Sequence, residues 1–319
     1  MQVSPRLRRW LTGSESDPSV RARFWLEVDG RSRKDPHVQA ALKAIGRTGW
    51  AASLLDYQLP DGHWVTPGTS VGELYRPKYI VTNWLAIVLA DLGMTRSDPR
   101  VRRTAEVILK RWGRKELASR GSEICVSGNA ARYLIRFGYL DHPVVQASIA
   151  WIVRTQKADG GWHCFRSRTG TLDSWEGLAA LAEIPERARD KSVRRSIESG
   201  AEFYLRHHLM EEGRVRYPPW FRIHYPNHYY YDLLVGLRIL TRLGYGADPR
   251  MTPALRWLRN KRGQDGTWAL DAAHPDLDEQ HGGYVFRDLA YPMLLEPLSL
   301  PSRWATVEAL SILTKVEKS

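Results

Sequence analysis

The sequence predicts an all-α protein in which buried helices alternate with amphipathic ones, arranged as a closed ring of about six helical hairpins. Three observations support this prediction. A turn of the form Asp-Gly-x-Trp occurs three times, Gly and Pro mark the ends and starts of the segments between the turns, and strand-like alternation rarely lasts beyond four residues. The composition agrees, because 13 Trp stand against 6 Phe among 319 residues, as expected if Trp is used repeatedly.

The repeated turns agree in their residues and in their spacing. They end at Trp64, Trp162 and Trp268. A Gln stands six residues before the first two Trp, and Arg262 takes this place in the third repeat. From Pro143 to Trp162 and from Pro249 to Trp268 the distance is 19 residues in both cases. Two motifs and one spacing that recur together indicate a structural repeat.

Each segment between these marks has the pattern of a helix. The stretch 144–153 begins after a Pro and carries its apolar residues on one broad face. The segment 83–90 is apolar nearly all round, whereas 101–104 carries charge on one side, and this difference separates buried helices from amphipathic ones. Inner helices are expected near 78–92, 124–137, 172–183, 227–243 and 302–315. Their outer partners are expected near 36–57, 98–112, 143–156, 190–208 and 249–261.

Two further segments complete the expected ring. A helix near 18–28 supplies the missing member, and the repeats run over 36–315 within a single domain, 1–319. The stretch 269–301 contains four Pro and is expected to be a long loop that crosses one face.

The composition excludes several classes of protein. No run approaches 18 apolar residues, so no transmembrane helix is expected, and the basic N-terminal stretch lacks the apolar core of a secretory signal. Two Cys are too few for a disulfide scaffold and suit a reducing cytoplasm. The net charge of +12 favours acidic partners and is compatible with a peripheral contact to an anionic bilayer. Nucleic-acid binding is not expected, because no such signature occurs and the basic residues are spread along the outer helices.

The alternating helices and the Gln-x3-Gly-x-Trp turns resemble the repeats shared by squalene and other triterpene cyclases and by the β-subunits of protein prenyltransferases. The resemblance covers residues 36–315 through the repeats, and it implies an (α/α)6 toroid. It also implies an apolar cavity inside the inner ring that holds an isoprenoid or a similar hydrophobic substrate. The chemistry is then expected at the rim where the inner helices begin.

The chain departs from both branches of this superfamily. Triterpene cyclases carry Asp-x-Asp-Asp at the start of an inner helix, where one Asp protonates an alkene. The nearest match here, Asp276-Leu277-Asp278-Glu279, falls in the Pro-rich stretch, and a solvated acidic loop is its favoured interpretation. Protein prenyltransferases bind zinc through Asp, Cys and His at successive helix starts and need a separate α-subunit, and this sequence lacks their Asp-x-Cys.

Two cysteines and a histidine are nevertheless candidate zinc ligands at the rim. Cys125 opens an inner segment, Cys164 lies in the loop after Trp162, and His228 begins another inner segment, with His224 just before it. Two thiolates and one imidazole leave a coordination position open for chemistry. The competing interpretation is that both Cys are small buried apolar residues. Zinc is the one cofactor that the sequence suggests.

Three acids are candidate catalytic residues. Asp173 and Glu176 stand three apart at the expected start of an inner helix, where a carboxylic acid kept neutral by an apolar wall can act as a general acid. For Asp173 the favoured alternative is an N-cap. Asp232 is the third candidate, within the expected inner segment 227–243.

Aromatic and basic residues near the expected inner-helix starts are candidate substrate contacts. The set is Trp84, Asn129, Trp175, Arg222, Tyr229, Tyr230, Tyr231, Arg303 and Trp304. The aromatic members can steady a carbocation through their ring faces or serve as ordinary packing between helices. Arg214, Arg216 and Arg222 surround the segment 217–221 and form either a cradle for a diphosphate or a solvated basic loop.

These residues predict an enzyme of isoprenoid metabolism, either a terpene cyclase or a prenyl-transfer relative. Its partner is a hydrophobic small molecule, with a prenyl diphosphate as one option. The competing class is a toroid that binds a hydrophobic ligand or partner without catalysis, since no helix start carries Asp-x-Asp-Asp. The expected location is the cytoplasm, with a peripheral membrane contact left open.

Overall fold

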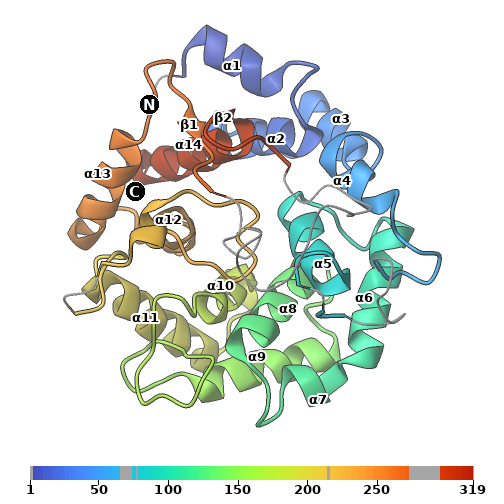
Figure 1. The fold of residues 1–319 in the computed structure, drawn as a ribbon, viewed down its shortest axis with the longest axis vertical. Coiled ribbons are helices and arrows are strands. Elements are labelled where there is room, and N and C mark those ends of the chain that lie inside the picture. Colours follow the sequence, from blue (N-terminus) through green and yellow to red (C-terminus); the bar gives the residue numbers. More distant parts are fainter. Residues whose placement is uncertain (1–2, 65–73, 77, 214–215, 273–294, 319) are drawn as a thin grey trace.

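The computed structural model describes residues 3–64, 74–76, 78–213, 216–272 and 295–318, and the helices in these ranges form a ring around a central axis (Figure 1). The inner helices are α2 (Pro18–Arg23, continued by a π-helical turn, Phe24–Val28), α5 (Thr82–Asp91), α8 (Ile124–Phe137), α10 (Glu176–Glu183), α12 (Leu233–Arg242) and α14 (Arg303–Lys318). The outer helices are α1 (Pro5–Thr12), α3 (Pro36–Ala44), α4 (Gly49–Leu55), α6 (Pro99–Arg111), α7 (Gly113–Leu117), α9 (Pro143–Thr155), α11 (Lys191–Arg206) and α13 (Thr252–Asn260).

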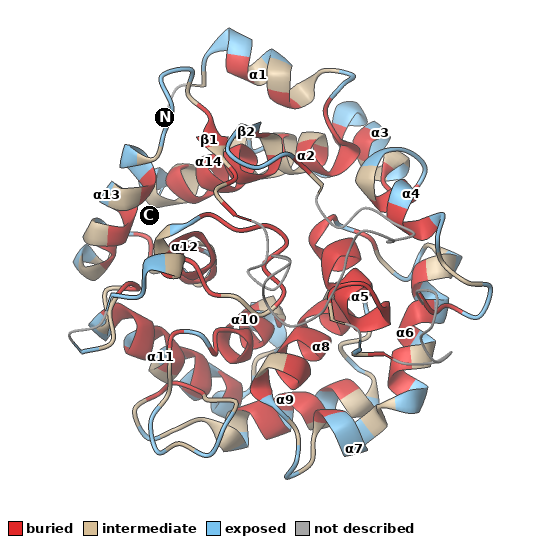
Figure 2. Ribbon diagram, in the orientation of Figure 1, coloured by how far each residue is buried: buried red, intermediate tan, exposed pale blue. Residues whose placement is uncertain are grey.

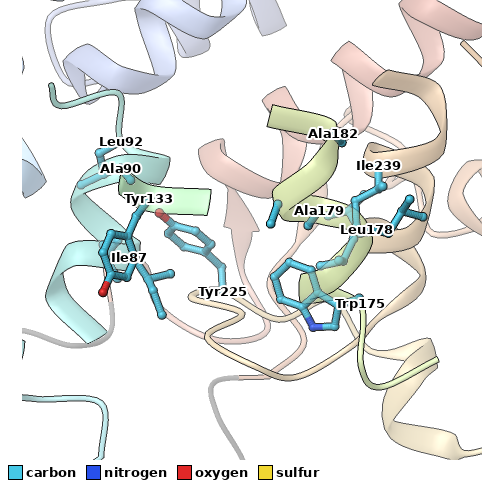
Figure 3. Close-up of a cluster of buried hydrophobic side chains, with 14 of the residues drawn as sticks. Ile87, Ala90, Leu92, Tyr133, Trp175, Leu178, Ala179, Ala182, Tyr225 and Ile239 are labelled. Carbon is cyan, nitrogen blue, oxygen red and sulfur yellow. The ribbon is translucent and has the colours of Figure 1, made fainter. Parts of the chain in front are cut away.

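Burial separates the two layers as the sequence predicts. All ten residues of α5 are buried, whereas α6 buries only the stripe Val101, Thr104, Ala105, Ile108 and Leu109 and exposes charge on its other side (Figure 2). In the interior, Tyr225 lies between Tyr133 and Ile87 on one side and Trp175 on the other (Figure 3). The prediction of an all-α fold with alternating inner and outer helices is confirmed, including an inner helix near 18–28.

The outer helices α1, α3, α6 and α9 begin where a polar side chain precedes Pro. The Asp98 carboxylate accepts a hydrogen bond from the Arg100 N–H at 2.8 Å, and His142 Nδ1 accepts one from Val144 N–H at 3.2 Å. These caps satisfy N–H groups that have no partner within the helix, and Pro fits the first turn because it has no N–H to satisfy. Gly138 ends α8 in the left-handed region at a φ of 99°.

The three Asp-Gly-x-Trp turns share one geometry. In each, the Trp indole N–H donates to the carbonyl ten residues earlier at 2.8 Å, and the Gly adopts a left-handed φ of 87–95°. The Gln of the first two turns ties the turn to the next outer helix, since Gln58 donates to Thr104 Oγ1 at 2.7 Å and Gln156 donates to the Ser196 carbonyl at 2.9 Å. In the third turn, Arg262 lies over the Trp268 ring instead, at 5.4 Å.

The inner helices run parallel, and their ends meet at one rim of the ring, here named the C-terminal rim. Arg132 and Arg136 of α8 both pair with Asp91 at the end of α5, the former at 3.0 Å. Glu183 at the end of α10 pairs with Arg136 and with Arg242 of α12, each at 2.7 Å. Cations in a final helix turn also favour the negative end of the helix dipole.

A second group of ion pairs continues this network to the remaining inner helices. Arg23 of α2 pairs with Glu308 of α14 at 2.6 Å and with Glu27 at 3.1 Å, and Arg238 lies 3.8 Å from Glu308. The residues of this rim surround a charged hollow of about 340 Å³.

Some boundaries differ from the prediction. The expected outer helix 36–57 is two helices, because Gly46 and Gly49 both adopt left-handed conformations between α3 and α4. The expected loop 269–301 is described only at its two ends, which form a short antiparallel pair, β1 (Trp268–Ala269) and β2 (Pro301–Ser302). Within the described ranges, no helix is long and apolar enough to cross a membrane.

Candidate functional site

Predicted site residues meet at the opposite rim, where the inner helices begin, here named the N-terminal rim. Cys125 is the second residue of α8, and Glu176 is the first of α10. Asn129, one turn into α8, ties the parts together, because its amide donates to the Cys125 carbonyl at 3.0 Å and to the His228 carbonyl at 2.8 Å. This fixes the loop before α12 against the first turn of α8.

The two cysteines are neighbours, although 39 positions separate them in the sequence. Cys164 interacts with the Cys125 thiol, the Cys125 backbone N–H and the Ser174 hydroxyl, and these interactions lower the pKa of Cys164 despite its burial. The Cys125 thiol donates a hydrogen bond to Glu123 Oε2 at 3.7 Å. The interaction with Cys164, together with burial, raises the pKa of Cys125.

The zinc set expected from the sequence is not assembled. Among the residues that the structure describes, no three or more His, Cys, Asp and Glu side chains come together in an arrangement that could hold a metal ion. His228 is buried between Tyr79, whose ring stacks on it at 5.1 Å, and Trp84, at 5.4 Å. Burial lowers the pKa of His228 to about 3, so its imidazole is neutral at physiological pH.

Glu176 is the one predicted acid with the environment of a general acid. Its side chain is fully buried, and neither carboxyl oxygen has a hydrogen-bond partner among the described residues. Burial, reinforced by the negative charge on Cys164, raises the pKa of Glu176 well above the usual 4.5. The surroundings therefore favour the protonated, neutral form of this carboxyl group.

Gly128 of α8 lies directly against the backbone of Glu176. A β-carbon at Gly128 would come within 2.7 Å of the Glu176 carbonyl carbon and of its Cβ. The absence of a side chain at Gly128 thus allows α8 and α10 to approach closely at the position of the acid.

An aromatic cluster surrounds His228, whose carbonyl is held by Asn129 of α8. Trp84 lies at its centre, with ring centroids 5.0 Å from Tyr75, 5.1 Å from Tyr79 and 5.8 Å from Tyr229. The Trp84 indole N–H donates to the Tyr75 carbonyl at 2.8 Å, which fixes its orientation. Four aromatic faces gathered in this way are an environment that favours a cation.

Two members of this region have strained backbones. Tyr79 and His228 are non-Gly residues in the left-handed region, with φ of 72° and 47°, and their rings stack on each other. Such conformations persist where the surrounding structure enforces them, and they cluster at functional sites.

The other two predicted acids have structural roles. Asp232 caps α12, accepting hydrogen bonds from Val235 N–H and His224 N–H at 2.8 Å each. Asp173 accepts one from the Trp220 indole at 2.8 Å and is exposed. It does not cap α10, which begins after Trp175 without a side-chain cap, so the N-cap interpretation is wrong.

Several residues predicted to contact a substrate interact with other parts of the protein instead. The Tyr231 hydroxyl donates to the Leu209 carbonyl at 2.7 Å, and Arg222 donates to the Asp271 carbonyl at 3.0 Å. Arg303 covers the ring of Trp10. Trp304 stacks on Tyr225 at 4.3 Å.

The remaining candidates divide between the site and the surface. Trp175 is buried beside Arg132, whose guanidinium lies 5.1 Å from its ring, and Tyr230 stacks on Tyr229 at 4.9 Å. Arg216 is exposed and pairs with Glu211 at 3.5 Å, and the diphosphate cradle stays a prediction. Arg214 and the Asp276–Glu279 match lie outside the described residues.

The sequence interpretation missed Tyr75, Tyr79 and Arg132. Tyr75 and Tyr79 precede an inner helix without any motif that marks them. For Arg132 the sequence does offer a signal. Most of its helix is buried, and a charged residue in such a helix must find partners inside the protein.

Comparisons with known proteins agree on the fold alone. No protein-family model matches the sequence, and no curated protein is significantly similar to it. A glycosyl hydrolase of family 88 from Bacteroides vulgatus is similar over 98% of this chain and 97% of its own, with a TM-score of 0.52 and 12% identity. A polysaccharide lyase is similar over 95% and 90%, with a TM-score of 0.50 and 11% identity. A variant of the type II terpene cyclase MstE from Scytonema, in complex with geranylgeranyl dihydroxybenzoate, is similar over 95% and 87%, with a TM-score of 0.46 and 15% identity. At such identities the similarity shows a helical toroid and no particular reaction.

Proposed function

We propose that the protein is an enzyme of the terpene cyclase type, in which the protonated carboxyl group of Glu176 donates its proton to a carbon–carbon double bond of a hydrophobic isoprenoid substrate. The observation that carries this proposal is the buried carboxyl group itself. Because neither of its oxygens has a partner among the described residues, the proton is not engaged elsewhere and is available to a substrate.

The aromatic cluster supports the same reaction. Protonation of an alkene leaves a carbocation, and the faces of Trp84, Tyr79 and Tyr229 can stabilise such a cation while the apolar surroundings keep water away. Gly128 and Asn129, adjacent in α8, place Glu176 and the loop that carries His228 at one turn of one helix. The reaction is an isomerisation, because the proton gained at one carbon is balanced by a proton lost at another after ring closure.

Cyclisation fits better than prenyl transfer. Prenyl transfer begins with loss of diphosphate, which requires concentrated positive charge near the leaving group. Of the arginines expected to supply this charge, Arg222 donates to the Asp271 carbonyl and Arg216 pairs with Glu211. A proton-initiated reaction needs only the acid and the aromatic walls.

The test uses squalene, geranylgeraniol and geranylgeranyl diphosphate as substrates, with products analysed by mass spectrometry after incubation in D2O. We expect a cyclised product that carries one deuterium at the protonated carbon. Glu176→Gln keeps the size of the side chain and should lower the rate by about 10²–10⁴-fold. Asp173→Asn is the matched control and should retain activity. Full activity of Glu176→Gln would exclude the proposed acid.

A binding protein without catalysis is the second candidate. Two of the three predicted acids, Asp173 and Asp232, are occupied by structural hydrogen bonds, which is what a toroid without catalytic acids would show. Native mass spectrometry with the same three lipids distinguishes the two. Retention of a lipid by the wild type and by Glu176→Gln alike, with no product from either, would favour binding alone.

A further inference from the structure

A basic hollow of about 570 Å³ lies beside Cys164, on the outer side of the α8 start. Its walls come from the segment between α7 and α8, the end of α9 and the loop after Trp162. Its charged lining residues are all cations, namely Arg120, Arg154, Lys157 and Arg166.

The four cations are free to bind an anion. Within the described part of the chain, none of these side chains forms an ion pair or donates a hydrogen bond, in contrast to the paired arginines of the C-terminal rim. Cations converging on one hollow raise the local concentration of anionic small molecules. Phe165, 75% exposed, adds an apolar surface to the lining.

Cys164 forms part of the same lining, and its sulfur has the environment of a nucleophile. It lines the hollow beside the four cations, and its interactions with Cys125 and with the Ser174 hydroxyl favour the thiolate. Both cysteines are partly accessible, and no disulfide joins them. Cys125 interacts directly with Cys164, and its thiol donates to Glu123 Oε2 at 3.7 Å.

We propose that Cys164 and Cys125 form a redox-active pair that exchanges with small anionic disulfides bound in the basic hollow. The Cys164 thiolate attacks one sulfur of the disulfide RS–SR, a mixed disulfide forms, and one RS⁻ leaves. The Cys125 thiol then gives up its proton and attacks the Cys164 sulfur, so that an intramolecular disulfide forms and the second RS⁻ leaves. The protein loses two electrons to the small disulfide, which is reduced to two thiolates. Glu123, 3.7 Å from the Cys125 sulfur, is placed to accept the proton.

The roles of the two cysteines follow from their surroundings. Cys164 belongs to the lining of the hollow and has interactions that favour its thiolate, so it meets the reagent first. Cys125 is not among the lining residues and is held by its contact with Cys164, which suits it to the second step. Neither step of this exchange uses Glu176 as a reactant, so the exchange can be tested apart from the proposed cyclisation.

The experiment treats the reduced protein with glutathione disulfide, which is anionic, and in parallel with hydroxyethyl disulfide, which is neutral. Intact-mass spectrometry and free-thiol titration follow the products. We expect glutathione disulfide to react faster by about tenfold at low ionic strength, with the difference shrinking as salt is added. Cys125→Ser should accumulate the mixed disulfide on Cys164, and Cys164→Ser should form no intramolecular disulfide.

The hollow is tested separately by charge removal. Arg154→Gln combined with Lys157→Gln should slow the glutathione disulfide reaction and leave the hydroxyethyl disulfide reaction unchanged. Arg256→Gln with Arg259→Gln on α13 is the matched control and should change neither. Equal rates for the two reagents at low salt would overturn the basic hollow as the binding site. Failure of the wild type to form an intramolecular disulfide with either reagent would overturn the pair.

Discussion

Buried carboxyl groups lie at both rims of the ring, and their surroundings differ. At the C-terminal rim, Asp91 and Glu183 are buried against two arginines each, and these guanidinium groups hold both pKa values below the usual range although burial alone would raise them. At the N-terminal rim, Glu176 has no such partner among the residues that the structure describes, and its pKa is raised. A buried carboxyl group must be either paired or neutral. The paired carboxylates thus stabilise one rim, whereas the unpaired carboxyl group at the other rim is the proposed acid.

Removal of a buried partner should produce the largest effect. Asp91→Ala leaves Arg132 buried without its ion pair and deprives Arg136 of one partner. We expect a loss of about 3–5 kcal/mol in the free energy of unfolding, because the cost is that of an uncompensated buried charge. Urea denaturation followed by circular dichroism measures it. A loss below about 1 kcal/mol would show that this rim contributes little to stability.

The turns near the N-terminal rim depend on their indole hydrogen bonds. Trp162→Phe keeps an aromatic ring but leaves the Ile152 carbonyl without its donor and reduces the buried volume. We expect a loss of about 1–3 kcal/mol. Trp268→Phe should behave alike, since the same bond is made to the Leu258 carbonyl. Unequal losses in the same denaturation assay would show that the shared geometry does not imply shared energetics.

The buried carboxyl groups of the two rims should change the stability of the protein in opposite directions as the pH rises. The raised pKa of Glu176 means that the folded state keeps a proton that the unfolded state releases above its pKa of about 4.5, so this residue lowers stability as the pH rises towards its folded-state pKa. Glu176→Gln should remove this term, and its stability relative to wild type should rise by up to about 1.4 kcal/mol per pH unit in that window.

Asp91 and Glu183 have the opposite sign. Their lowered pKa values contribute stability that is present above the unfolded-state pKa and is lost as the pH falls through the folded-state values. Denaturation of wild type and Glu176→Gln between pH 5 and 9 tests the first term. A difference between the two proteins that does not change with pH would show that Glu176 is ionised throughout.

The smallest change in the free energy of unfolding is expected for a surface ion pair. Glu202 and Arg250 pair at 2.9 Å while both side chains are well exposed. Glu202→Gln should change the free energy of unfolding by less than about 0.5 kcal/mol, because exposed pairs are screened by water and salt. A loss comparable to that of Asp91→Ala would contradict the distinction between the rim network and the surface.

The helical ring could be predicted from the sequence because its signals are local and repeated. Gly, Pro and Asp at helix boundaries act within a few residues, and burial all round or on one face is visible in the segments themselves. The predicted starts of the inner helices are less accurate, because local signals do not separate a helix from the turn that precedes it. The inner helix expected from residue 172 begins at Glu176, because the turn between Thr171 and Ser174 comes first. The one expected from 227 begins after Asp232.

The site could be predicted only in part, because its contacts join distant segments. The approach of Cys125 to Cys164 followed from the expectation that inner-helix starts meet at one rim. The three consecutive residues Tyr229, Tyr230 and Tyr231 show the limit of predicting a site from its local sequence. Tyr229 joins the aromatic cluster, whereas Tyr231 turns away to the Leu209 carbonyl. Nothing in the local sequence distinguishes them, since the difference is set by the loop between Arg222 and Asp232.

The contact between Gly128 and Glu176 has a consequence for variation in this site. Because Gly128 places only a hydrogen atom against the backbone of Glu176, the spacing of α8 and α10 fixes the position of the Glu176 carboxyl group. Even an added methyl group at Gly128 would act as a wedge, moving the acid away from any molecule it serves before its chemistry changed. Tyr75 and Tyr79 precede α5 and make no such backbone contact with Glu176, so changes in the size of their rings are expected to leave the acid in place.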